Sequence, residues 1–402
     1  MSIDLARPVA ILISPVLPEP TGSGRALRAW AWVTELAREH EVHVVVADVT
    51  AAADEGPSAL AGATAMWRCR TGFEVPRRLV KGAGLALAPL SLLSRSFVLG
   101  WHYLTRSAFA PKLVSTLKSR QVSRIIVFRH YLADLGESLV AQFPGARLEL
   151  DMDDLESQTR VSLARAYLDL GKYGDAAAML ASAVQYKLLE TRLPGSFAQI
   201  LIAAEEDRLA LARRGVRKVA CRPNRVPSPR PAPDLPPSGD LRLLFVGTLN
   251  YAPNLQAVHR LLRSVVPELR RQVDGKWRLT IAGRQAPLRL VEELRSVPEI
   301  DFVDDAPDLA PLYRQAQIAL VPLRAGGGTK LKTIEAFAHG RAVVSTRHGV
   351  RGLAAVPDRD FLLAESDRDF ATAITALAHD RARLARVAQA GMELCRDNYA
   401  AY

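Results

Sequence analysis

Short apolar runs alternate with helical patterns along most of the chain. The first run is followed by a glycine-containing turn at Thr21–Gly24 and by a helical stretch to about His40. This alternation is typical of a parallel sheet with helices on both faces. The runs expected to form strands before residue 222 are Val9–Ile13, Val42–Val46, Arg124–Phe128 and Phe197–Ala203.

A proline-rich segment divides the chain. Seven prolines lie between Pro223 and Pro237, and proline fixes φ and lacks a backbone N–H, so this segment is expected to be an extended linker. The pattern predicts an N-terminal Rossmann-like domain over 1–222, a linker over 223–240 and a C-terminal Rossmann-like domain over 241–385. A last helix over 386–402 is expected to cross back towards the N-terminal domain.

The alternation restarts after the linker. Asn254 is expected to cap a helix whose apolar residues run from Leu255 to Leu269, and two helical patterns begin at about Asp367 and Asp380. The runs expected to form strands are Leu241–Val246, Leu279–Ala282, Ile318–Pro322 and Ala342–Ser345. The prediction is an α/β protein of two Rossmann-like domains that face each other across a cleft, where the carboxyl ends of the strands bind ligands.

The segment Val321–Gly352 carries the clearest chemistry. A strand leads into the glycines Gly326–Gly328, and a helix is expected to begin near Thr329. Glycines allow a phosphate to approach the backbone, and the N–H groups at a helix N-terminus bind anions. Lys330 adds a charge there, and Glu335 offers a carboxylate to a ribose diol. The alternative is a tight turn with Glu335 on a solvated helix face.

Composition narrows the function classes. The chain has 402 residues and a net charge of +11, but it shows no zinc-finger spacing and no long basic run, which argues against nucleic acid as a partner. The three cysteines are far apart and fit neither a metal site nor a disulfide framework, as is typical of a reducing compartment. No signal peptide or membrane span is expected, so the predicted location is cytoplasmic. The basic, leucine-rich segment Arg77–Lys112 is either a helical insertion or a peripheral contact with the inner face of the membrane.

The segment GGGTKLKTIEAFAHGRAVVST resembles the donor-site signature of retaining GT-B glycosyltransferases of the group-1 (family-four) type. The similarity extends over FVGTLNYAPN, LTIAGRQAP and DFVDDAPDLAPLYRQAQIALVPLR, and so covers nearly all of the second domain. The first domain is similar more loosely, through PTGSGRALR, HEVHVVVADV and DMDDLES. The resemblance implies a GT-B fold and the transfer of a sugar from a nucleotide-sugar donor with retained configuration.

The resemblance also implies roles for single residues. Glu335 would hold the donor ribose, Val303 and Asp304 would pack on the base, and Glu335 and His130 would serve catalysis. The remaining residues expected to bind the donor are Gly22, Gly24, Gly247, Arg284, Gly327, Gly328, Thr329, Lys330 and Leu331. No metal and no cofactor are expected, because the nucleotide-sugar is itself a substrate.

Two positions depart from the family pattern. The family often carries a glutamate eight residues before the ribose glutamate, where this chain has Gly327. Many members also place Arg and Lys after the first glycine of the second domain, where FVGTLNYAPN has no cation. Bacterial exopolysaccharide-type transferases look similar in both respects. Arg284, Arg324 or Lys330 is expected to replace the missing charge.

Several polar residues follow strands of the first domain. His130 is either a donor-sugar ligand or structural. Asp153, in DMDDLES, either binds acceptor hydroxyls or a cation, or caps a helix at its start, where a negative charge is favourable. Arg25 either contacts the acceptor or lies on a solvated helix face.

The prediction is therefore a glycosyltransferase that uses a nucleotide-sugar donor and a sugar, lipid-linked or small-molecule acceptor. The alternatives are a sugar-nucleotide epimerase and a catalytically silent homologue that binds nucleotide or a partner.

Overall fold

The computed structural model describes residues 7–48, 55–70, 97–98, 101–102, 110–191, 193, 195–226, 240–273 and 275–401. The chain forms two compact units, the first comprising Met1–Gln158 and Leu180–Arg222, and the second Thr159–Met179 and Pro223–Tyr402. Of the expected linker, 227–239 lie outside the described residues, as does most of Arg77–Lys112.

The first unit is built on an eight-stranded sheet in the order β10-β9-β8-β7-β1-β2-β4-β3, in which only β3 and β4 pair antiparallel. Its strands are β1 Val9–Ser14, β2 Glu41–Asp48, β3 Glu55–Leu60, β4 Ala63–Arg70, β7 Val122–Phe128, β8 Arg147–Asp153, β9 Gln199–Ile202 and β10 Val219–Cys221. Two further short strands, β5 Phe97–Val98 and β6 Trp101–His102, form a separate pair.

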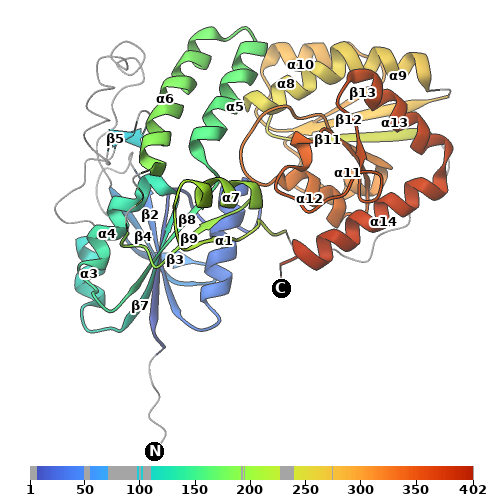
Figure 1. Ribbon diagram of the computed structural model, residues 1–402. Helices are drawn as coiled ribbons and strands as arrows, with labels where there is room; N and C mark the ends of the chain where they lie inside the picture. The colour runs from blue at the N-terminus through green and yellow to red at the C-terminus, as the bar shows by residue number, and fades with distance from the viewer. Residues whose placement is uncertain are drawn as a thin grey trace, which may run out of the picture. The chain divides into compact units, whose positions relative to one another are not determined.

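Helices cover both faces of this sheet (Figure 1). Successive residues of β1 point to opposite sides. Val9, Ile11 and Ile13 pack in one apolar cluster with residues of α3 and α4, whereas Ala10 and Leu12 pack in another with α1. The helical segments that lie before residue 222 are α1 Gly24–Leu36, α3 Pro111–Leu117, η1 His130–Leu132, α4 Ala133–Val140, α5 Glu156–Asp169, α6 Tyr173–Thr191 and α7 Glu205–Arg213.

The second unit holds a parallel sheet in the order β13-β12-β11-β14-β15-β16. β14 and β15 are buried along their whole length, as expected for strands covered on both faces. The strands are β11 Leu241–Val246, β12 Trp277–Gly283, β13 Ile300–Asp304, β14 Ile318–Val321, β15 Ala342–Ser345 and β16 Leu362–Leu363. The helical segments are α8 Ala252–Arg260, η2 Leu261–Val265, α9 Val266–Gln272, α10 Leu288–Arg295, α11 Ala310–Gln315, α12 Leu331–Ala338, η3 His348–Val350, α13 Asp367–His379 and α14 Arg381–Asn398.

Each run predicted as a strand forms one, and the α/β class with two Rossmann-like units is confirmed. The prediction that Asn254 caps a helix is wrong. Helix α8 begins at Ala252, because Pro253 fits the first turn of a helix. α12 begins at Leu331, two residues later than expected, because Lys330, with a ψ of 85°, is outside the helical conformation.

The two units differ from the predicted domains: the second includes the segments expected as a linker and as a last helix, 223–240 and 386–402. Thr159–Met179, most of α5 and the start of α6, group with the second unit, although the sequence places them in the first domain. Ala166 of this stretch packs with Ala252 and Ala325. The C-terminal helix starts at Arg381 and packs on α12, α13 and β15, and its predicted return to the first domain stays a prediction. None of the described helices combines the length and apolarity needed to cross a membrane.

Candidate functional site

The strand order of the second unit reverses direction at one point of the sheet. From β11 the chain proceeds to β12 and β13 on one side, and then returns to β14 and β15 on the other. In open α/β sheets, ligands bind at the carboxyl ends of the strands where the order reverses. Gly247 follows β11 and the glycines Gly326–Gly328 follow β14, so both lie at this switch point.

The glycine turn needs glycine for its backbone. Gly326 has a φ of 112° and Gly328 a φ of 59°, values that strain most other residues. The turn is held through its carbonyl groups: Lys330 Nζ donates to the oxygens of Gly326 at 3.0 Å and Gly327 at 2.8 Å. His348 Nε2 lies 2.9 Å from the same Gly326 oxygen. Since a carbonyl only accepts, Nε2 carries the proton.

Burial and the neighbouring positive charges keep the His348 ring neutral. Burial lowers the pKa of His348 to about 4, and the neighbouring Lys330 and Arg351 lower it as well. Lys330 is itself buried. The ammonium expected to face a diphosphate therefore binds the carbonyl side of the turn, where it positions the backbone.

The N–H groups of the turn are mostly unengaged by the protein. Gly326 N donates to Ser162 Oγ at 3.0 Å, but in the described part of the chain the N–H groups of Gly327 and Gly328 have no hydrogen-bond partner. Both precede the N-terminus of α12, where the helix dipole favours negative charge. The turn thus offers two N–H groups to a phosphate.

Glu335 lies just over one turn into α12 and is paired electrostatically with Lys332. Burial raises the pKa of the Glu335 carboxyl to about 7, against the lowering effect of Lys332. Burial lowers the pKa of the Lys332 ammonium to about 7, against the raising effect of Glu335. Lys332 Nζ donates to Asn254 Oδ1 at 2.6 Å and lies 4.5 Å from the centre of the Phe245 ring.

Gly247 allows this arrangement because it has no Cβ. A Cβ there would lie 2.8 Å from Asn254 Nδ2 and 3.0 Å from Lys332 Nζ. The lysine of α12 therefore reaches back to the end of β11, beside the first glycine of the second unit.

The other residues predicted to bind the donor lie along the same edge of the sheet. Arg284 follows β12 and is exposed, and its backbone oxygen accepts from Leu249 N at 2.9 Å. Val303 and Asp304 end β13, with Val303 partly buried against the core and Asp304 exposed. Thr329 is buried before α12, whose first residue, Leu331, is partly buried.

The first unit has a switch point between β1 and β7. After β1 the chain makes a turn in which Gly22 has a φ of 104°, and Gly24 is the first residue of α1. After β7 come Arg129 and His130. The predicted residues of this unit therefore gather at one edge of its sheet.

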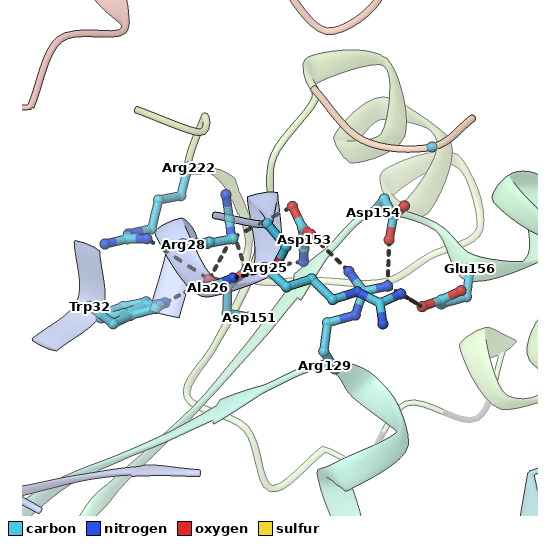
Figure 2. A network of polar contacts seen from close by, with 12 residues as sticks. Arg25, Ala26, Arg28, Trp32, Arg129, Asp151, Asp153, Asp154, Glu156 and Arg222 are labelled. Carbon is cyan, nitrogen blue, oxygen red and sulfur yellow. Dashed lines mark hydrogen bonds and ion pairs between the residues drawn. The ribbon is translucent and has the colours of Figure 1, made fainter. Parts of the chain in front are cut away.

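Figure 2 shows a charged network at the carboxyl end of β8. Asp151 is fully buried and accepts from Arg28 Nε and Nη2, each at 2.8 Å, and from Trp32 Nε1 at 2.6 Å. Burial alone would raise the pKa of Asp151, but the Arg28 guanidinium holds it below its usual value. Arg222 stacks on Trp32 at 3.9 Å. These contacts fix α1 to the sheet.

Arg129 is the centre of the second half of this network (Figure 2). Its guanidinium pairs with Asp153 at 2.8 Å, with Asp154 at 2.8 Å and with Glu156. Arg129 and Asp153 have φ values of 84° and 64°, and such strained conformations cluster at functional sites. The sequence analysis missed Arg129, although it directly precedes His130 at the end of a strand.

His130 is buried and neutral at physiological pH. Burial lowers its pKa to about 4, while the nearby Glu156 raises it. Among the described residues Nδ1 has no hydrogen-bond partner, and the ring lies 6.1 Å from that of Tyr186. Arg25 is partly exposed and lies 3.8 Å from Glu156. Asp153 is engaged by Arg129 and lies 3.7 Å from Arg28, not at a helix start. No group of three or more His, Cys, Asp or Glu in the described ranges is arranged to hold a metal.

Comparisons with known proteins concern the fold and the family of part of the second unit. Residues 240–380 match the family model described as glycosyl transferases group 1. No match is found among curated proteins. Among solved structures, the sucrose-phosphate synthase of Thermosynechococcus elongatus is similar with a TM-score of 0.66 at 16% identity, over 98% of this chain and 95% of that one.

Two further structures are similar over the whole chain. HepE of Anabaena in complex with UDP and glucose has a TM-score of 0.60 at 12% identity, over 97% of this chain and 95% of that one. The α,α-trehalose-phosphate synthase (UDP-forming) of Burkholderia xenovorans, in complex with glucose-6-phosphate, has a TM-score of 0.60 at 14% identity, over 98% and 97%. The protein thus has the GT-B fold of two Rossmann-like domains, and residues 240–380 of its second unit match the glycosyl transferases group 1 family.

Proposed function

We propose that this protein transfers a sugar from a UDP-sugar to an acceptor hydroxyl with retained anomeric configuration. One observation carries the proposal: at the switch point of the second sheet, the N–H groups of Gly327 and Gly328 precede a helix that carries Glu335 one turn later. N–H groups that bind phosphate and a carboxylate that binds a ribose are what a nucleoside diphosphate requires. The family match of 240–380 supports the same reading.

The choice of uridine rests on the similar structures. HepE of Anabaena is described with UDP, and the Burkholderia synthase as UDP-forming. In this chain Val303 and Asp304, at the end of β13, would contact the base. Glu335 would accept the ribose hydroxyls, and Gly327 and Gly328 would donate to the diphosphate.

In the proposed reaction the bond between the anomeric carbon and the diphosphate oxygen breaks, and the acceptor oxygen attacks from the same face. The proton of the acceptor hydroxyl passes to the departing diphosphate, and UDP leaves. N–H groups already oriented towards the developing negative charge would stabilise it. Gly327 stands where relatives often carry a glutamate, so the proposal assigns no protein carboxylate as a nucleophile and needs no metal.

The acceptor site is proposed at the switch point of the first unit. There Arg25 retains solvent contact and Asp153 is partly exposed. These groups suit a hydroxylated acceptor: a sugar, a small molecule or a lipid-linked sugar. Polysaccharide synthesis in the cytoplasm, with peripheral membrane contact through Arg77–Lys112, is part of the same proposal.

The test has two steps. Thermal shift against a panel of nucleoside diphosphates should give the largest rise in melting temperature with UDP, because a ligand of the native state stabilises it. Release of UDP from UDP-sugars is then measured with and without sugar and sugar-phosphate acceptors. Release that requires an acceptor supports the proposal. Interconversion of UDP-sugars without an acceptor would indicate an epimerase, and binding without turnover a silent homologue.

A further inference from the structure

The structure contains a positive charge that the sequence pattern does not reveal. The loop after β11 carries no cation, but Lys332 of α12 brings its Nζ to the end of β11, 3.0 Å from where a Cβ of Gly247 would stand. Because β11 and β14 are neighbours, this ammonium lies at the same switch point as the glycine turn.

The protein provides few interactions that stabilise the positive charge of Lys332. Its one hydrogen bond is to the neutral amide oxygen of Asn254 at 2.6 Å, and the face of the Phe245 ring lies at 4.5 Å. In the described part of the chain it forms no salt bridge, and the carboxylate that favours its charged form is that of Glu335. An ammonium with two free donors beside an anion-binding turn is suited to a ligand phosphate.

The other candidate cations are less suitable. Lys330 is bound by the carbonyl oxygens of Gly326 and Gly327. Arg324 is exposed and donates to the backbone oxygen of Glu365 at 3.4 Å. Arg284 is exposed after β12, one strand away from the switch point.

We propose that Lys332 binds the diphosphate of the donor and replaces the cations that the loop after β11 lacks. The inference rests on the proposed function and assigns one residue within it. Lys332 and Glu335 then bind different parts of the nucleotide: the ammonium binds the phosphates, and the carboxylate binds the ribose. Asn254 and Gly247 position the ammonium.

The test compares the binding of UDP with that of uridine. The dissociation constant of uridine divided by that of UDP measures how much the diphosphate contributes to affinity, and this quotient is the ratio used below. Calorimetric titration would use the wild type, Lys332→Met, Glu335→Ala and the control Lys276→Met, which removes an exposed lysine just before β12. Lys332→Met should reduce the ratio about 10- to 100-fold, the effect of one hydrogen bond to a charged group. Lys276→Met should leave it unchanged. Glu335→Ala should weaken the binding of both UDP and uridine, and it should change the ratio little.

The outcomes separate this inference from the proposed function. If the wild type binds neither UDP nor uridine, the donor assignment is wrong and the role of Lys332 falls with it. If the wild type binds UDP but Lys332→Met keeps the wild-type ratio, Lys332 does not bind the diphosphate and the proposed function stands. An equal loss for UDP and uridine in Lys332→Met would make its role structural. Melting temperatures of all four proteins show whether each variant is folded.

Discussion

Replacing Glu335 by alanine tests the donor site most directly. The side chain lies on α12, just over one turn from the first residue of the helix, and has no salt bridge or hydrogen bond within the described residues that would make it structural. If it holds the ribose, its removal should weaken nucleotide binding without weakening the fold.

The expected loss of affinity follows from the number of hydrogen bonds. A carboxylate can accept from both ribose hydroxyls, and each bond to a charged group contributes about 1.5–3 kcal/mol. With a pKa of about 7, Glu335 is about half protonated at pH 7. This lowers its contribution to the free energy of UDP binding by only a few tenths of a kcal/mol. We therefore expect UDP to bind Glu335→Ala at least about tenfold more weakly than wild type.

The effect on stability should have the opposite sign. The pKa of Glu335 rises from 4.5 to about 7 on folding, so the unfolded state loses this proton first and stability falls as pH rises through that window. The full cost above pH 7 is about 3 kcal/mol at about 1.4 kcal/mol per pKa unit. Lys332 loses its neighbour in the variant, and Glu335 retains some solvent contact, so we expect a gain of about 1–2 kcal/mol at pH 8.

The assays are calorimetric titration with UDP and urea unfolding at pH 8. Glu335→Gln keeps an acceptor oxygen and should lose less affinity than alanine. The control Glu292→Ala removes an exposed carboxylate of α10 and should change neither quantity. Wild-type affinity in Glu335→Ala would show that the nucleotide does not bind on α12. A large loss of stability would show that the carboxylate supports the fold.

Three further predictions concern other parts of the structure. Arg28→Met leaves Asp151 buried without its partner, so the free energy of unfolding should fall by about 3–5 kcal/mol in urea titrations; a loss below 1 kcal/mol would mean that other groups compensate. Gly326→Ala places a Cβ at a φ of 112° and should strain the turn by about 1–3 kcal/mol, so UDP affinity measured by calorimetry should drop. UDP affinity should be greatest near pH 7. It should fall at lower pH as Glu335 is protonated, and at higher pH as Lys332, whose pKa the nearby charge of Lys330 also lowers, loses its proton. Lys332→Arg should lose the alkaline fall, and an unchanged profile would refute the pairing.

The sequence alone was sufficient for much of the second unit. Leu241–Val246 and Ala342–Ser345 form strands with the predicted bounds, because a short run of buried apolar residues is a local signal. The glycine turn and Glu335 are close in sequence, so their common position at the start of α12 follows from the order of residues. The resemblance to group-1 glycosyltransferases rests on this same continuous segment.

Contacts between distant segments were decided by the tertiary structure. The sequence gives no sign that Lys332 lies beside Gly247, because that contact depends on β11 and β14 being neighbours in the sheet. The same holds for Arg129, whose carboxylate partners lie at the end of the adjacent strand β8 and directly after it. Local periodicity determines which segments form strands and helices. Strand order determines which charges meet, and it results from packing of the whole unit, which no single segment encodes.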